Sequence, residues 1–378
     1  MWHRRTLLKS AIASATLAFA APATAQTDTP TPVVATFSIL GDMVKRIGGE
    51  HVEVTTLVGA DGDAHVYQPT PTAARAVSES ELLVVNGLGF EGWLDRLIAA
   101  SDFDGVRVAA TDGIDPIAFN GAHDHSNGDA HADEAGADHD DEHDAHGEEV
   151  GHDHDEEGDH DHDHAEDGAE AGHDRDHDEH EASADHDHEP SDEARDAHDH
   201  DHGAFDPHAW QSLENAVTYV DNITAALAKA DPENAADFYQ NRAAYVAEIR
   251  ALDSEIHEIV ENLPEDRRIV VTSHDAFQYF ARDYGLRFLS PQGVSTESEA
   301  SAQDVARLIE TIREEGVDAV FFENIADTRL LERIADETGA SIGGTLYPGA
   351  LSGPDGPAPS YLDMMRHNAT TLADALSS

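Results

Sequence analysis

The chain has 378 residues, no cysteine and a formal net charge of −56 at pH 7. The absence of cysteine excludes disulfides, thiolate ligands and thiol nucleophiles, so a metal site would need His, Asp, Glu, backbone or water. Such an acidic chain repels nucleic acid and anionic lipid, so neither is an expected partner, whereas cations are. The length suffices for two domains of ordinary size.

Residues 1–25 have the pattern of an export signal. Arg4, Arg5 and Lys9 supply positive charge before an Ala-rich apolar stretch, and Ala23-Thr24-Ala25 forms a small-residue cleavage site. The pair of arginines also resembles a twin-arginine signal, so both the Sec and the twin-arginine route stay open. No later stretch approaches the roughly 18–20 apolar residues of a membrane span, so we expect no direct membrane insertion.

The next part, residues 26–231, is expected to form an N-terminal α/β lobe. Short apolar runs alternate with stretches of helical periodicity. Strands are predicted at 33–37, 54–58 and 82–86, and helices at 39–47, 73–80, 90–100 and 213–229.

This lobe is interrupted by a low-complexity segment at 120–203. Between residues 122 and 202 it contains 34 Asp and Glu against two Arg, and it holds 19 of the 26 histidines. With almost no aromatic or branched apolar residues, it is expected to be a disordered loop. Many weak His-Asp sites on one chain raise the local concentration of ligands, so the segment is predicted to collect or sense metal ions. The alternative is a solubilising insertion. The predicted auxiliary metal ligands in this segment are His152, His154, His160, His162 and His164.

A long helix is predicted at 232–263, where apolar residues recur three and four positions apart over roughly 45 Å. It would link the first lobe to a C-terminal lobe at 264–378. There, strands are predicted at 269–272, 287–290, 319–323 and 341–347, and helices at 276–284, 302–315, 330–338 and 361–376. The sequence thus predicts two Rossmann-like α/β domains with mainly parallel sheets, joined by a long helix. Ligands of such folds bind beyond the carboxyl ends of strands, in an inter-domain cleft.

Three histidines lie where residues of such a cleft are expected. His65 occupies a Gly- and Pro-bounded loop after a strand, His208 precedes a helix, and His274 directly follows an apolar strand. His51, His257 and His367 are expected to pack or to face solvent.

Several ordered motifs carry a family resemblance over nearly the whole mature chain. They are Ala35–Leu40, Asp63–His65 with Tyr67–Thr70, Asp206–Trp210, Ser273–Phe277, Ser295–Glu299, Phe321–Glu323 and Ser360-Tyr361, together with the His-rich acidic loop. They resemble the zinc-binding (ZnuA-like) branch of the metal-binding solute-binding proteins of ABC importers. The resemblance implies a monomeric periplasmic protein whose His65, His208 and His274 ligate the transported Zn²⁺. It also implies a membrane permease as partner, and a periplasmic zinc chaperone as a further one.

Three imidazoles favour zinc over manganese, which prefers carboxylate and water. The family often supplies a fourth ligand, an aspartate, where this chain has Gly349; water or Asp355 would then take that position. Glu299 and Glu323 are weaker candidates, expected as structural partners of the site. Two alternatives stay open: another divalent metal such as manganese, or a zinc hydrolase with three histidines and a bound water. For the hydrolase, no His-Glu-x-x-His helix or other known catalytic set is present.

Overall fold

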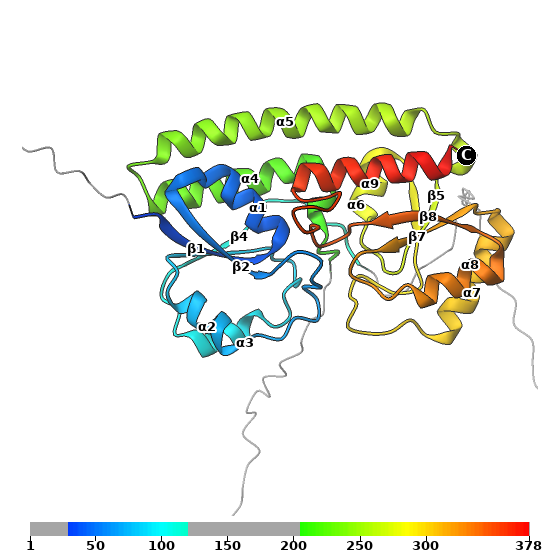
Figure 1. Ribbon diagram of the computed structural model, residues 1–378, viewed down its shortest axis with the longest axis horizontal. Helices are drawn as coiled ribbons and strands as arrows, with labels where there is room; N and C mark the ends of the chain where they lie inside the picture. Colours follow the sequence, from blue (N-terminus) through cyan, green and yellow to red (C-terminus); the bar gives the residue numbers. More distant parts are fainter. Residues whose placement is uncertain (1–28, 120–204, 378) are drawn as a thin grey trace, which may run out of the picture. The chain divides into compact units, whose positions relative to one another are not determined.

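The computed structural model describes residues 29–119 and 205–377, which belong to one compact unit containing two sheets (Figure 1). The predicted signal and the predicted His-rich loop, with its five candidate histidines, lie outside the described residues. Among the described helices, none is long and apolar enough to cross a membrane.

The first sheet has four parallel strands in the order β2-β1-β3-β4. Both faces of its centre are covered, so β3 is a continuous apolar run, Leu-Leu-Val-Val, with all four residues buried. The elements of this lobe are β1 (Thr31–Phe37), α1 (Ser38–Gly48), η1 (Gly49–His51), β2 (Val52–Val58), α2 (Pro71–Ser78), β3 (Leu82–Val85), α3 (Leu94–Ser101), β4 (Val106–Ala109), η2 (Ala209–Gln211) and α4 (Leu213–Ala230).

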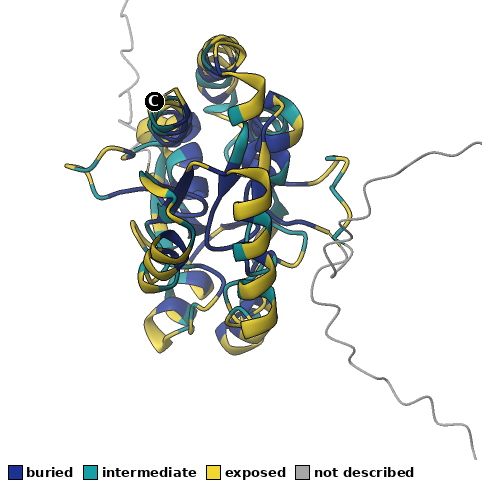
Figure 2. Ribbon diagram, turned by 90° about the vertical axis from the view of Figure 1, so that its right-hand side faces the viewer, coloured by how far each residue is buried: buried dark blue, intermediate teal, exposed yellow. Residues whose placement is uncertain are grey.

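The second sheet repeats this plan, with parallel strands in the order β6-β5-β7-β8. Its elements are η3 (Glu265–Arg267), β5 (Ile269–Val271), α6 (Gln278–Tyr284), β6 (Arg287–Leu289), α7 (Ala302–Glu315), β7 (Ala319–Glu323), α8 (Arg329–Thr338), β8 (Ser341–Leu346) and α9 (Tyr361–Leu376). The central strands β1, β3, β5 and β7 are largely buried in the interior of the unit, whereas the outward faces of the helices are exposed (Figure 2). The predicted fold class, two α/β domains with parallel sheets, is confirmed.

The helix α5 (Ala235–Glu261) runs past both sheets (Figure 1). It contacts α1 and α4 of the first lobe as well as α6 and α9 of the second. It has 27 residues, about 40 Å, and begins three residues later than predicted. The reason is a turn before it, in which the Asp231 carboxylate accepts bonds from the backbone and side chain of Asn234.

One strand of the first sheet, β4, escaped prediction. It is a four-residue edge strand in which Val106 and Arg107 are exposed, so it lacks the continuous apolar run of its buried neighbours.

Candidate metal centre

The three predicted histidines converge although they are far apart in the sequence. His65 lies in the loop between β2 and α2, His208 immediately precedes η2, and His274 follows β5. One ring nitrogen of each lies within 4.8 Å of the others. The residues are only 6%, 0% and 0% exposed, respectively. Among the described residues, no other His, Asp or Glu belongs to such a group.

His208 is fixed by Asp206, two positions before it. Oδ1 of Asp206 lies 2.8 Å from Nδ1 of the His208 ring and also accepts the His208 backbone N–H at 2.9 Å. A carboxylate beside Nδ1 keeps the proton on that nitrogen, which leaves the lone pair of Nε2 free for a metal. Tyr279 holds the segment further by donating its hydroxyl to the Asp206 carbonyl at 2.8 Å.

His274 is fixed in the same way from a neighbouring strand. Oε2 of Glu323, at the end of β7, lies 2.6 Å from Nδ1 of His274. Oε1 accepts the backbone N–H groups of Ser273 and His274 at 2.9 and 3.1 Å. Nε2 of His274 is buried and has no hydrogen-bond partner among the described residues. A buried nitrogen left without a partner is costly, and a metal ion would satisfy it.

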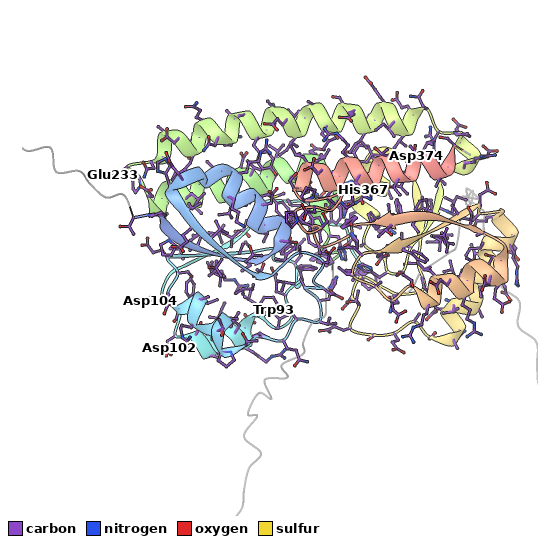
Figure 3. All side chains as sticks on the ribbon, viewed as in Figure 1. Trp93, Asp102, Asp104, Glu233, His367 and Asp374 are labelled. Carbon is purple, nitrogen blue, oxygen red and sulfur yellow. The ribbon has the colours of Figure 1, made fainter. Side chains whose placement is uncertain are left out.

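His65 is held through its backbone rather than through its ring. Its N–H donates to Oδ1 of Asp63 at 2.9 Å, and its ring packs edge-on against Phe90 with centroids 4.7 Å apart. The preceding carbonyl, of Ala64, accepts the indole N–H of Trp93 at 2.8 Å. The Trp93 side chain lies in the lower part of the first lobe, near α3 (Figure 3).

The pKa values of the three rings diverge. Burial lowers the pKa of His65 and of His208 well below the ordinary value, and the neighbouring rings lower them further. Burial also lowers the pKa of His274, but the Glu323 carboxylate outweighs burial and raises it above the ordinary value. Burial likewise raises the pKa of Asp206 to about 7. His65 and His208 are therefore neutral, as metal ligands must be, and His274 is the ring that retains a proton longest.

The nitrogen positions suit a small tetrahedral cation. Nε2 of His65 and Nε2 of His208 lie 3.2 Å apart. Two nitrogens that each bind zinc at 2.0–2.1 Å in tetrahedral geometry are about 3.3 Å apart. The donor set of three imidazoles, with the buried Nε2 of His274, therefore fits Zn²⁺ or a similar divalent ion.

The remaining candidate residues lie elsewhere. Asp355 is exposed in a turn, and Glu299 is exposed as well, so the structure brings neither to the three histidines. Glu323 contacts His274 through Nδ1, the structural role that was expected of it. His51 contacts Asp237, His257 packs on Tyr284, and His367 on α9 (Figure 3) bonds the Thr345 carbonyl.

Two supporting residues, Asp63 and Asp206, were not singled out from the sequence. Both precede a histidine by two positions, and each accepts the backbone N–H of that histidine at 2.9 Å. This is a local Asx-turn bond, so the repeated Asp-x-His pattern was a readable signal.

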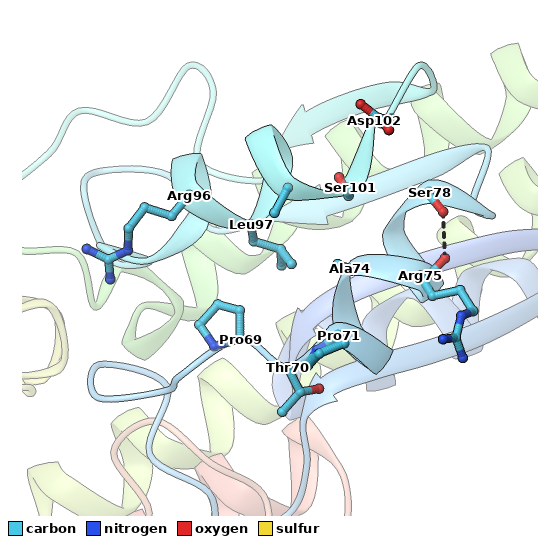
Figure 4. A pocket seen from close by; sticks show the side chains of 11 residues that line it. Pro69, Thr70, Pro71, Ala74, Arg75, Ser78, Arg96, Leu97, Ser101 and Asp102 are labelled. Carbon is cyan, nitrogen blue, oxygen red and sulfur yellow. Dashed lines mark hydrogen bonds between the residues drawn. The ribbon is translucent and has the colours of Figure 1, made fainter.

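A larger cavity, about 680 Å³, lies apart from these histidines between α2 and α3 (Figure 4). Its wall is largely apolar, with Pro69, Leu97 and two arginines, Arg75 and Arg96. Two guanidinium groups in the wall disfavour a divalent cation. This cavity is therefore not the metal site, although it is larger than the space beside the histidines.

Comparison with known proteins agrees with the fold. Residues 33–375 match the family described as zinc-uptake complex component A, periplasmic. The manganese-binding lipoprotein MntA of Halalkalibacterium halodurans is 27% identical over 346 residues, 91% of this chain and 88% of the relative. The iron-binding protein YfeA of Yersinia pestis is 27% identical over 341 residues, 90% and 85% of the two chains.

Solved structures show the same fold. A manganese-bound periplasmic metal-binding protein of Candidatus Liberibacter asiaticus superimposes with a TM-score of 0.65 at 26% identity, covering 92% of this chain and 99% of the other. The periplasmic zinc-binding protein TroA of Treponema pallidum gives a TM-score of 0.69 at 23% identity, covering 93% and 100%.

The chain therefore belongs to the family of zinc-uptake complex component A, the metal-binding, extracytoplasmic components of ABC transporters. Members of this family are substrate-binding proteins and not enzymes, so the hydrolase alternative is wrong.

Proposed function

We propose that this chain captures Zn²⁺ in the periplasm and delivers it to the membrane subunits of an ABC importer. The ion is cargo, and the proposed ligands are the Nε2 atoms of His65, His208 and His274. The main observation behind this proposal is that two of the three rings are fixed by a carboxylate at Nδ1. The carboxylates of Asp206 and Glu323 bind Nδ1 of His208 and of His274, respectively. The Nε2 atoms of both rings therefore remain available for a metal beside His65.

Zinc is preferred over manganese because the convergent group contains three imidazoles and no carboxylate. Imidazole suits zinc, whereas manganese favours carboxylate, carbonyl and water. Manganese is the second candidate, because relatives of this chain are named as manganese-binding proteins.

We assign the fourth coordination position to water. The family resemblance places Gly349 where an aspartate often stands, and a glycine offers no side-chain ligand atom. Asp355 is exposed in a turn outside the group of histidines, so it would have to move to reach the ion.

The segment 120–203 is proposed as an auxiliary zinc collector that raises the ion concentration near the cleft. Its support is compositional: 34 acidic residues and 19 histidines on one stretch of chain. A periplasmic zinc chaperone as a further partner rests on the resemblance alone.

The test is a competitive zinc titration of three proteins. They are the mature chain, a variant lacking residues 122–202, and a full-length variant with His65→Ala, His208→Ala and His274→Ala. We expect the loop-deleted protein to keep one tight zinc and the triple variant to keep only weak sites. A tight zinc in the triple variant would overturn the three-histidine site. Loss of the tight site on loop deletion would mean that the loop supplies ligands. A parallel manganese titration decides between the two metals.

A further inference from the structure

A small pocket of about 60 Å³ opens beside His65, which is the one member of the three-histidine group that lines it. Its wall comes from both lobes, with Leu88, Phe90 and Pro207 from the first and Val294 and Glu297 from the second. Since liquid water occupies about 30 Å³ per molecule, the pocket has room for one or two waters or for a partly dehydrated cation.

Glu297 is the only charged carboxylate or amine among the residues that line this pocket. It is exposed, and its carboxylate makes no hydrogen bond or ion pair with the described residues. Oε1 of Glu297 lies near Gly92 of the other lobe: a Cβ atom added to Gly92 would be 3.9 Å from this oxygen. The carboxylate thus stands at the solvent side of the pocket, with the imidazole of His65 further in.

Two further acidic residues of the site, Asp63 and Glu323, already have partners. Both oxygens of Asp63 accept hydrogen bonds, from the His65 backbone and from Thr296, and Glu323 holds His274. Of these carboxylates, only that of Glu297 is free to attract a cation from solvent.

The rim of the pocket is held in an uncommon backbone conformation. Leu88 has a φ of 54° between two glycines with φ of 94° and 76°, so three successive residues are left-handed. The conformation is unfavourable for a non-glycine residue, and such strain is typically retained at functional sites. Leu88 lines the pocket together with Glu297.

We propose that this pocket is the route by which the divalent cation reaches His65, and that Glu297 is the capture residue that binds it first. The carboxylate raises the local cation concentration and replaces part of the hydration shell before the imidazole takes over. This inference rests on the proposed function, because it assumes that the ion ends at the three histidines.

The chain carries its own probe for the test. Of its three tryptophans, Trp2 lies in the predicted signal, Trp93 bonds the residue before His65, and the Trp210 ring lies 5.2 Å from that of His208. The His-rich segment contains no tryptophan. Stopped-flow tryptophan fluorescence of the full mature chain mixed with Zn²⁺ therefore reports on the cleft and not on that segment.

Three variants are compared with the parent: Glu297→Gln, Glu297→Asp, and Glu310→Gln as the control. Glu310 is an exposed acid on α7 of the same lobe, away from the pocket. We expect Glu297→Gln to slow zinc association about threefold to tenfold, to weaken its dependence on ionic strength, and to leave dissociation unchanged. Glu297→Asp keeps the charge and is expected to restore most of the rate.

Equal association rates in Glu297→Gln and Glu310→Gln would overturn the proposal. Faster dissociation without slower association would also overturn it, because Glu297 would then act as a ligand of the bound ion. The variant with all three histidines replaced by alanine separates the two levels of inference. If it gives the parent's fluorescence change, the three-histidine site itself is wrong; if the change is lost, only the access route is in question.

Discussion

Glu323 and His274 are joined by a contact of 2.6 Å between Oε2 and Nδ1, and neither side chain reaches solvent. The other carboxylate oxygen accepts two backbone N–H groups of the same loop. Replacement of Glu323 by Gln puts an amide NH₂ where an acceptor is needed, so the His274 ring loses its fixed orientation and its basicity. We expect zinc affinity to fall about 10- to 100-fold, the usual effect of removing such a partner.

The measurement for this substitution is a competitive zinc titration, with Glu310→Gln as a control for loss of one negative charge on the same lobe. Thermal unfolding of the metal-free proteins reports separately on the fold. Unchanged affinity in Glu323→Gln would show that the carboxylate stabilises the loop but does not affect the orientation or basicity of the His274 ring.

The pKa directions predict how zinc binding depends on pH. Because Glu323 raises the pKa of His274 while burial keeps those of His65 and His208 low, His274 is the first ring to be protonated as pH falls. Zinc binds neutral imidazole, so affinity is constant above the pKa of His274 and declines below it. One displaced proton corresponds to about a tenfold rise in Kd per pH unit.

Titrations between about pH 5 and 8, with proton release measured by calorimetry in several buffers, test this. Asp206, whose pKa burial raises to about 7, can release a second proton in this range. A slope of three protons per zinc would contradict the prediction, because His65 or His208 would then be charged as well. The variant Glu323→Gln is expected to move the decline to lower pH.

The fold was largely predictable because parallel strands buried on both faces have continuous apolar runs, as Leu82–Val85 does. His274 was predictable because it lies three positions after the last residue of such a strand, β5. Its partner was harder to find: Glu323 lies 49 positions away, and only the adjacency of β5 and β7 brings the two together. The bond from Thr296 to Asp63 spans 233 positions and joins the two lobes, which no local pattern specifies.

Gly349 offers a test of the fourth coordination position. It is buried, its φ is not left-handed, and a Cβ at this position would meet only Trp210 at an ordinary 3.8 Å. The substitution Gly349→Asp is therefore expected to be accommodated and to supply the carboxylate that this chain lacks. Because manganese prefers oxygen ligands, we expect manganese affinity to rise by about tenfold or more, and by a larger factor than zinc affinity.

Parallel manganese and zinc titrations of Gly349→Asp and Gly349→Asn measure this change. Asn has nearly the same shape but no charge, so it separates the effect of the carboxylate from that of filling space. Equal affinities in the Asp variant and the parent would mean that residue 349 does not face the ion.

The hydrogen bond from the Thr296 hydroxyl to Oδ2 of Asp63, at 2.6 Å, predicts how firmly the lobes hold the ion. The other oxygen of Asp63 binds the His65 backbone, so the bond connects a proposed ligand segment of one lobe to a loop of the other. Thr296→Val preserves the shape and removes the donor. The lost bond is worth about 0.5–1.5 kcal/mol, so we expect zinc dissociation to accelerate about two- to tenfold.

Zinc release from Thr296→Val into excess chelator, followed by tryptophan fluorescence, gives this rate directly. Thr328→Val is the matched control, because its hydroxyl bonds Glu332 within the second lobe and makes no bond to the described residues of the first. If both variants release zinc at the parent's rate, the contact between Thr296 and Asp63 does not limit opening. If association changes and dissociation does not, the bond shapes the path of the incoming ion and does not retain the bound one.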